Sequence, residues 1–274
     1  MIPIVSANGA QIPALGFGTW PLKGDECIAA VSAALDAGYR HIDTATMYAN
    51  EREVGEAIGN HAVPRDEIFL TTKVWHTDLD HDAMIASTEA SLAHLGVDRV
   101  DLLLIHWPDL QMPIAEQVGN LCDAKRRGLA RHIGISNFPS RMVDEAVAVA
   151  DEPLVANQVE YHPFLGQSAV LAACRRHGLA LTAYSPIARG RVSDNPVIQA
   201  IAGEKGKSET QVVLRWLIQQ PGVVAIPKSA DPARIRANIA ITDFVLTDAE
   251  MARISALGSR EGRRGDFDWS PDWD

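Results

Sequence analysis

The chain has 274 residues, 47% of them hydrophobic and 22% charged, and a formal net charge of −10 at pH 7. This composition is typical of a globular protein. The acidic balance argues against non-specific nucleic-acid binding and against binding to anionic membranes, because both depend on basic surfaces. It remains compatible with a local basic pocket for a small phosphate-bearing ligand.

The three cysteines, Cys27, Cys122 and Cys174, are isolated in the sequence, so no disulfide framework is expected. The first stretch, MIPIVSANGAQIPAL, has neither the charged start nor the long apolar core of a signal peptide. No window approaches the roughly 18 consecutive apolar residues that a membrane helix needs. We therefore expect a cytoplasmic protein that does not interact with membranes.

The predicted elements begin with a β-hairpin, because the pair Asn8-Gly9 favours a two-residue turn. Short apolar runs then predict eight strands, at residues 15–18, 41–43, 68–73, 100–106, 132–135, 154–158, 180–184 and 223–227. Between them, apolar residues at spacings of three and four predict helices at 24–37, 51–59, 81–95, 113–127, 140–150, 168–177, 208–219 and 232–239.

This alternation of strands and helices indicates parallel strands joined by helical crossovers. Eight such units predict an α/β fold, a closed (β/α)8 TIM barrel with an N-terminal β-hairpin, formed by residues 1–274 as a single domain. The main alternative is an open doubly wound sheet, which usually carries G-x-G-x-x-G after its first strand. The stretch GFGTWP lacks the third glycine, and this favours the barrel.

Polar or aromatic residues follow nearly every predicted strand, at the end of the barrel where active sites lie. In chain order they are Thr19 and Trp20, Asp43, Lys73, His106 and Trp107, Ser136 and Asn137, Asn157 and Gln158, Tyr184 and Ser185, and Lys228 and Ser229. The strand interiors are otherwise apolar. We therefore expect these side chains to meet at one rim of the barrel.

Four of them form a chemically coherent set: Asp43, Lys73, His106 and the nearby Tyr48. A lysine ammonium favours the phenolate and so makes a neighbouring tyrosine more acidic, and an aspartate keeps the lysine charged and in place. A histidine can donate a hydrogen bond to a carbonyl oxygen. Such a site would polarise a carbonyl group and protonate its oxygen, while the hydride must come from a nicotinamide cofactor.

Each of these residues alone also has an ordinary structural interpretation. Asp43 and Lys73 could be a buried ion pair without catalytic function, His106 a core histidine, and Tyr48 a packing residue with a solvated hydroxyl. Burying four titratable groups together lowers stability unless they have a task, so their conjunction favours an active site.

Several stretches of the chain resemble the aldo-keto reductase family, especially its short bacterial members of the 2,5-diketo-D-gluconate reductase type. They are GYRHIDTATMYANEREVG at 38–55, TTKVW at 71–75, LLIHWP at 103–108, RHIGISNF at 131–138, NQVEYHP at 157–163 and IPKSADPARIRANIAI at 226–241. The resemblance implies a TIM-barrel oxidoreductase that uses NADPH. It also implies a catalytic tetrad of Asp43, Tyr48, Lys73 and His106, with Tyr48 as general acid.

The resemblance also implies the cofactor contacts. Ser136, Asn137 and Gln158 match positions that hold the nicotinamide carboxamide, and Tyr184 matches the aromatic residue that stacks on the ring. The expected clamp on the adenosine 2′-phosphate consists of Lys228, Ser229 and Arg234, with Asn238 near the adenine. Thr19, Trp20 and Ser185 complete the expected cofactor site. Ala237 departs from the family pattern, because many relatives have a glutamate there that contacts adenine.

The spacing of Lys228 and Arg234 independently indicates a local cationic pocket in an acidic chain, which suits NADPH better than NADH. The ordinary alternative for Arg234 and Arg236 is a solvated helix face.

The substrate pocket is expected to have aromatic walls from Trp20, Trp75, Trp107 and Phe138, each of which follows a predicted strand. The segment after His106 and the tail REGRRGDFDWSPDWD are short, so we expect an open pocket with broad specificity for small carbonyl compounds. Trp269 and Trp273 either reach the barrel mouth or belong to a disordered segment. The sequence predicts a monomer.

Other motifs carry less weight. HTDLDHD at 76–82 lacks zinc-ligand spacing, so we expect no metal, and Asp80 or Asp82 instead starts a helix. Two alternative functions remain: a Schiff-base lyase in which Lys73 attacks a carbonyl, and a cofactor-binding regulatory subunit of the same fold. The expected Asp43 partner argues against the first, and the complete tetrad argues against the second.

Overall fold

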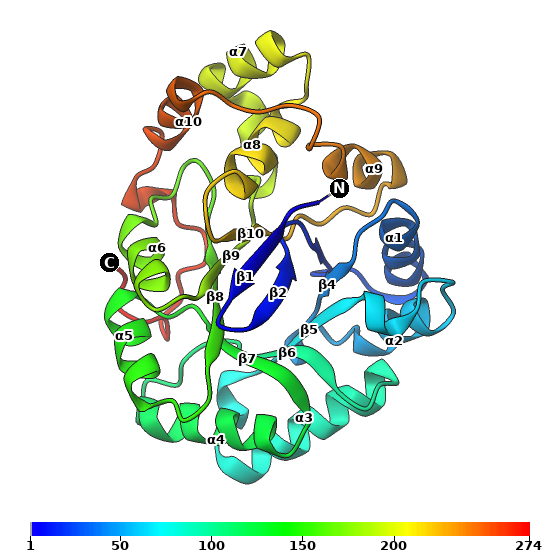
Figure 1. Cartoon of the computed structure of the whole chain (residues 1–274), viewed down its shortest axis with the longest axis vertical. Helices are drawn as coiled ribbons and strands as arrows, with labels where there is room; N and C mark the ends of the chain where they lie inside the picture. The colour runs from blue at the N-terminus through cyan, green and yellow to red at the C-terminus, as the bar shows by residue number, and fades with distance from the viewer. Residues whose placement is uncertain (1) are drawn as a thin grey trace.

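The computed structural model describes residues 2–274, which form a parallel β-barrel surrounded by helices (Figure 1). Eight neighbouring strands run in chain order: β3 (Phe17–Gly18), β4 (His41–Asp43), β5 (Phe69–Val74), β6 (Val100–Ile105), β7 (Ala130–Ser136), β8 (Leu154–Glu160), β9 (Ala180–Tyr184) and β10 (Val223–Ala225). All pair in parallel. This confirms the predicted (β/α)8 architecture.

The barrel closes between its first and last strands. Leu15 forms a parallel bridge with Ala225, and the Gly18 amide donates to the Pro227 carbonyl at 3.0 Å. A Cβ atom on Gly18 would lie 2.9 Å from the Ile226 carbonyl oxygen. Glycine is therefore what allows the two strands to approach closely enough to close the barrel.

Helices cover the outside of the barrel (Figure 1). They are α1 (Gly24–Asp36), α2 (Glu51–Gly59), α3 (His81–Leu95), α4 (Ile114–Arg126), α5 (Ser140–Val149), α6 (Ser168–Arg176), α7 (Pro196–Lys205), α8 (Glu209–Ile218), α9 (Pro232–Ile239) and α10 (Asp248–Ser255). The expected helices are all present within a few residues. Helices α7 and α10 were not predicted, because the expected pattern has one helix for each strand.

The N-terminal hairpin lies across the lower end of the barrel. Strands β1 (Ile4–Ala7) and β2 (Ala10–Pro13) are antiparallel, and Asn8 and Gly9 both have positive φ, as a two-residue hairpin turn requires. Ala7, Ala10 and Ile12 are buried against interior residues of β6, β8, β9 and β10. The hairpin therefore covers one end of the barrel, here called the lower end. The upper end, where the parallel strands terminate, stays uncovered by the hairpin.

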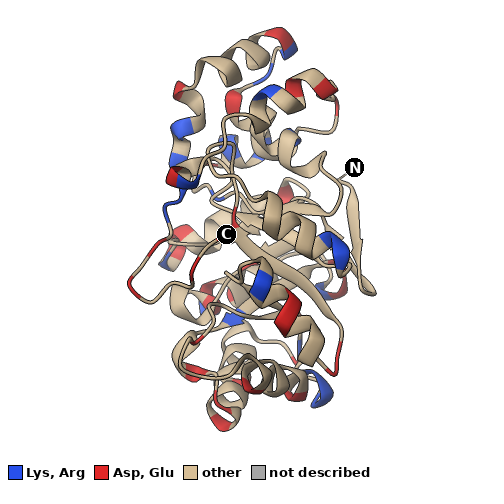
Figure 2. Ribbon diagram, turned by 90° about the vertical axis from the view of Figure 1, so that its left-hand side faces the viewer, with Lys and Arg blue, Asp and Glu red and all other residues tan. Residues whose placement is uncertain are grey.

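In the ribbon of Figure 2, segments that carry Lys or Arg alternate with segments that carry Asp or Glu along the helices. Within residues 2–274, none of the helices combines the length and apolarity required to span a membrane.

Close packing of α2 on α3 depends on Gly55. A Cβ atom there would lie 2.6 Å from the Leu95 carbonyl oxygen, whereas a Cβ atom on Gly59 of the same helix would have nothing within 4 Å. The two glycines differ in packing although both are helical.

We predict that Gly55→Ala lowers the free energy of unfolding by about 1–3 kcal/mol, because the added methyl group forces the two helices apart. Gly59→Ala is the matched control, and should instead raise stability by up to about 1 kcal/mol, since alanine restricts the unfolded chain more than glycine does. Urea denaturation of the two variants measures both effects. Equal stabilities would contradict the packing argument.

Candidate active site

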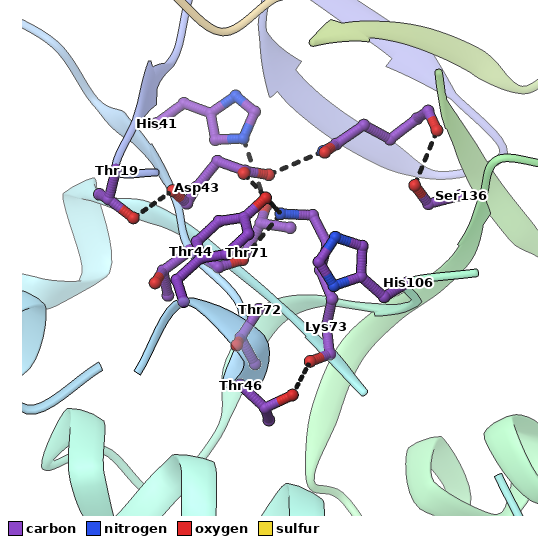
Figure 3. Close-up of polar contacts among 12 residues, drawn as sticks. Thr19, His41, Asp43, Thr44, Thr46, Thr71, Thr72, Lys73, His106 and Ser136 are labelled. Carbon is purple, nitrogen blue, oxygen red and sulfur yellow. Dashed lines mark hydrogen bonds and ion pairs between the residues drawn. The ribbon is translucent and has the colours of Figure 1, made fainter. Parts of the chain in front are cut away.

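The centre of the site is the Lys73 side chain, which is completely buried at the end of β5 (Figure 3). Its ammonium nitrogen lies 2.6 Å from Asp43 Oδ1, 2.8 Å from the Thr44 carbonyl oxygen and 3.2 Å from the Tyr48 hydroxyl. An ammonium group has three N–H donors, so every donor of Lys73 has an acceptor. The structure thus brings together three of the predicted residues.

The chain after β4 places Tyr48 in this cluster. Residues Thr46–Tyr48 form a short 3-10 helix, which ends where Ala49 adopts a left-handed conformation. The Thr46 hydroxyl donates to the Lys73 carbonyl oxygen at 3.0 Å (Figure 3), and the Asn50 side chain donates to the Thr19 and Leu22 carbonyls. These bonds fasten the loop to β5 and β3 and so orient the phenol.

Asp43 is itself held on both oxygens. While Oδ1 pairs with Lys73, Oδ2 accepts a 2.7 Å hydrogen bond from the Gln158 amide nitrogen. The backbone carbonyl oxygen of Gln158 accepts a hydrogen bond from the Ser136 hydroxyl at 2.8 Å. The expected carboxamide-binding residues and the Asp43 carboxylate therefore belong to one hydrogen-bond network, which was not predicted from the sequence.

Asn137 extends this network towards the cavity. Its amide nitrogen donates to the His106 carbonyl oxygen at 2.9 Å, and its amide oxygen accepts from the Tyr184 hydroxyl at 2.9 Å. Asn137 and Ser185 both have positive φ, a sparsely populated conformation that recurs at functional sites.

Burial and charge act in opposite directions on the tetrad. Burial lowers the pKa of Lys73, but Asp43 and Tyr48 outweigh it and raise the pKa overall. Burial also raises the pKa of Tyr48, and Lys73 only partly offsets this rise. Lys73 lowers the pKa of Tyr48, as predicted, but the prediction of a more acidic Tyr48 is wrong for the protein without ligands, because burial raises this pKa more than Lys73 lowers it.

His106 is neutral in this environment. Burial, together with the Lys73 charge, holds the pKa of its imidazole well below the usual range. Its ring contacts those of Tyr48 and Trp75 edge-on, with centroids 5.5 Å and 5.1 Å away, and its buried Nδ1 has no hydrogen-bond partner among the described residues. A neutral imidazole at this position can still donate one N–H to a ligand.

These groups face a cavity of about 510 Å³ at the upper end of the barrel. The predicted site residues that line it are Thr19, Trp20, Asp43, Tyr48, His106, Trp107, Asn137, Tyr184, Ser185, Lys228 and Arg234. The cavity is therefore lined both by three members of the expected tetrad and by two residues of the expected phosphate clamp.

The remaining predicted residues stand behind this lining. Lys73, Ser136 and Gln158 act through the network described above, while the Ser229 hydroxyl accepts from the Asp231 amide at 3.1 Å, just before α9, and Asn238 is buried in α9. Trp75 was predicted to form a wall of the pocket, but it contacts the His106 ring edge-on and is not among the residues that line the cavity. Phe138 was also predicted to form a wall of the pocket, and this is wrong, because its side chain is completely buried among core residues.

Of the two predicted alternatives for the tail, the structure shows the one in which it reaches the barrel mouth, because Trp269 and Trp273 both contact Trp107. The tail residues that line the cavity were not predicted. Arg264, Gly265 and Phe267 line it together with Met47 and Arg189. Their positions depend on pairing across the fold, and the only sequence signal was the density of aromatic residues after residue 266.

Three further predictions concerned the start of a helix, the cysteines and a metal site. Asp80 begins α3 as its N-cap, and its carboxylate accepts from the Ala83 amide at 3.2 Å. The three cysteines are buried and unpaired. Among residues 2–274, no group of three or more His, Cys, Asp or Glu side chains is arranged to hold a metal ion.

Comparison with known proteins gives the family. The profile of the Aldo/keto reductase family matches residues 14–259. An aldo-keto reductase of Mycolicibacterium smegmatis is 40% identical over 96% of each chain, and morphine 6-dehydrogenase of Pseudomonas putida is 40% identical over 93% of this chain and 91% of its own.

Solved structures agree. A putative 2,5-diketo-D-gluconic acid reductase B is 48% identical with a TM-score of 0.98, over 100% of this chain and 98% of that one. A Bombyx mori aldo-keto reductase in complex with NADP is 36% identical with a TM-score of 0.88, over 96% and 94%. The chain belongs to the aldo/keto reductase family, whose members are NADP-dependent oxidoreductases.

We predict that the His106 imidazole takes up its proton at a lower pH than an ordinary histidine, because its pKa is lowered by burial and by the Lys73 charge. His81 is the internal control, because its ring nitrogens donate hydrogen bonds to the Asp82 and Asp123 carboxylates, which raise its pKa above the usual value. The ring-proton NMR shifts of the two residues measure both. The free energy of unfolding should also fall as the pH drops below about 6.5, because His106 takes up a proton in the unfolded chain but not in the folded protein. A titration of His106 near neutral pH would contradict the assignment.

Proposed function

We propose that this protein reduces aldehydes and ketones to alcohols with NADPH, and that Tyr48 donates the proton. The observation that carries the proposal is the contact of the Tyr48 hydroxyl with the Lys73 ammonium at 3.2 Å, inside a cavity that also exposes His106. This combination can polarise a carbonyl oxygen and protonate it.

The cavity fits a nicotinamide dinucleotide phosphate. Lys228 and Arg234 supply positive charge at one end, which suits the 2′-phosphate. At the other end, the Tyr184 ring is fixed by its hydrogen bond to Asn137 and offers a flat face for the nicotinamide. When bound, the cofactor supplies the hydride that no side chain can provide.

The residues of the chain provide the proton and the orientation. His106 is neutral and donates a hydrogen bond to the substrate oxygen, while the Tyr48 hydroxyl approaches the same oxygen and releases its proton as the alkoxide develops. Lys73 stabilises the resulting phenolate, and Asp43 keeps Lys73 charged. Burial raises the pKa of Tyr48, so the phenol keeps its proton until negative charge develops on the substrate oxygen.

Two other functions fit the structure less well. A Schiff-base lyase needs a neutral lysine with a free electron pair, whereas all three donors of Lys73 are engaged and its pKa is raised. A purely cofactor-binding role gives no reason for a complete tetrad that faces the cavity.

We predict that Tyr48→Phe lowers the rate of aldehyde reduction by about a thousandfold, the order expected for loss of a general acid. The affinity for NADPH should not change, because the ring remains in place. Stopped-flow NADPH oxidation measures the rate, and quenching of tryptophan fluorescence measures the affinity. A rate within tenfold of wild type would contradict the role of Tyr48.

We predict that Arg234→Met raises the KM for NADPH about ten- to a hundredfold, the factor that corresponds to one charge-assisted hydrogen bond. The KM for NADH should change little. Arg236→Met is the matched control, because Arg236 is exposed on the same helix but does not line the cavity. Equal effects of the two substitutions on NADPH would contradict the assigned clamp.

A further inference from the structure

The tail, residues 263–274, lies against the barrel mouth and is fixed at both ends. At its first end, the buried Glu160 carboxylate accepts hydrogen bonds from the Arg264 and Gly265 amides at 2.9 Å and 2.8 Å. The same carboxylate pairs with His162 at 3.0 Å. This anchor fixes the point at which the tail enters the cavity wall.

The second end is fixed on helix α5, which Figure 1 shows beside the C label. Pro139 occupies the N-cap of α5 and makes no side-chain cap. The Asp274 carboxylate takes over this function: Oδ2 accepts from the Ser140 amide at 2.8 Å, and Oδ1 accepts from the Ser140 hydroxyl. The first amides of a helix lack internal partners, and the helix dipole favours an anion there.

Between the two ends, the aromatic residues of the tail pack on those of the barrel. Phe267 stacks on Trp269 with centroids 4.8 Å apart, and Trp269 contacts Trp107 edge-on at 4.9 Å. The Arg263 guanidinium lies 3.6 Å from the centroid of Trp273, whose indole nitrogen donates to Asp266 at 3.0 Å. Phe267 is half exposed and lines the cavity, so the packing behind it fixes one wall.

We propose that Asp274 is a positioning residue for the substrate pocket: by latching the tail to Ser140 it holds Phe267 in place, and the resulting wall selects carbonyl compounds that carry an aromatic ring. This inference rests on the proposed carbonyl reduction.

The shape of the cavity supports this substrate class. Trp20 and Trp107 supply further aromatic surface to the lining, beside Tyr48 and His106. Flat aromatic groups gain contact area and favourable ring geometry against such walls. A short aliphatic aldehyde has no ring to pack against Phe267, so we expect its turnover to depend little on the tail.

The test compares 2-naphthaldehyde with propanal in wild-type protein and in Asp274→Ala, Asp274→Asn and Asp272→Ala. In Asp274→Ala, kcat/KM for 2-naphthaldehyde should fall about five- to tenfold through KM, the factor that loss of a helix cap corresponds to. The value for propanal and the affinity for NADPH should not change. Asp274→Asn should rescue most of the loss, because its amide oxygen can still accept from Ser140. Asp272→Ala is the control, since Asp272 is exposed.

Hydrogen exchange gives a readout independent of turnover. Asp274→Ala should speed exchange at the Ser140 amide and along residues 264–270. Unchanged exchange, or an equal loss with both aldehydes, would overturn the latch. If wild-type protein reduces neither aldehyde, the proposed function and the aromatic selectivity fail together, and exchange alone decides whether Asp274 holds the tail.

Discussion

The site depends on one constraint: a lysine ammonium is buried completely inside the mouth of the barrel. Removing an ammonium from water is costly unless partners replace its hydration. Asp43, the Thr44 carbonyl and the Tyr48 hydroxyl together do this for Lys73. The need to satisfy this charge therefore fixes where β4 ends, how the following loop turns and where the phenol points.

The same constraint extends outward through Asp43. Gln158 satisfies the second carboxylate oxygen, Ser136 bonds to Gln158, and Asn137 bonds to Ser136 and Tyr184. These hydrogen bonds restrict the movement of the side chains that they join, and preorganised catalysis requires such rigidity. The residues that orient the proposed proton donor and those expected to hold the cofactor thus belong to one hydrogen-bond network.

The fold was largely predictable because each strand is a short apolar run that ends in a polar residue. This pattern located Asp43, Lys73 and His106 on neighbouring strand ends without knowledge of their contacts. Helix α10 was predictable in principle, because Thr247 and Glu250 form a capping box, whereas α7 follows a strand already assigned a helix. Phe138 was misplaced because a residue after a strand can turn inward to the core as readily as to the cavity.

Other features could not be derived from local sequence. The Ser140–Asp274 contact joins residues 134 positions apart, and no pattern in either segment indicates the other. The pKa of Tyr48 is raised by burial of the phenol and lowered by the nearby Lys73 charge. The relative size of these two effects depends on the three-dimensional arrangement. The sequence identifies the chemical groups of the site, but their pKa values and contacts depend on how the chain packs.

The central claim is that Asp43 keeps Lys73 charged inside the protein. The most direct measurement is the ¹⁵N chemical shift of Lys73 Nζ, followed from about pH 6 to pH 10, below the ordinary lysine pKa of about 10.4. The account predicts an ammonium signal throughout this range, with slow exchange of its protons. Conversion to a neutral amine within the range would contradict it.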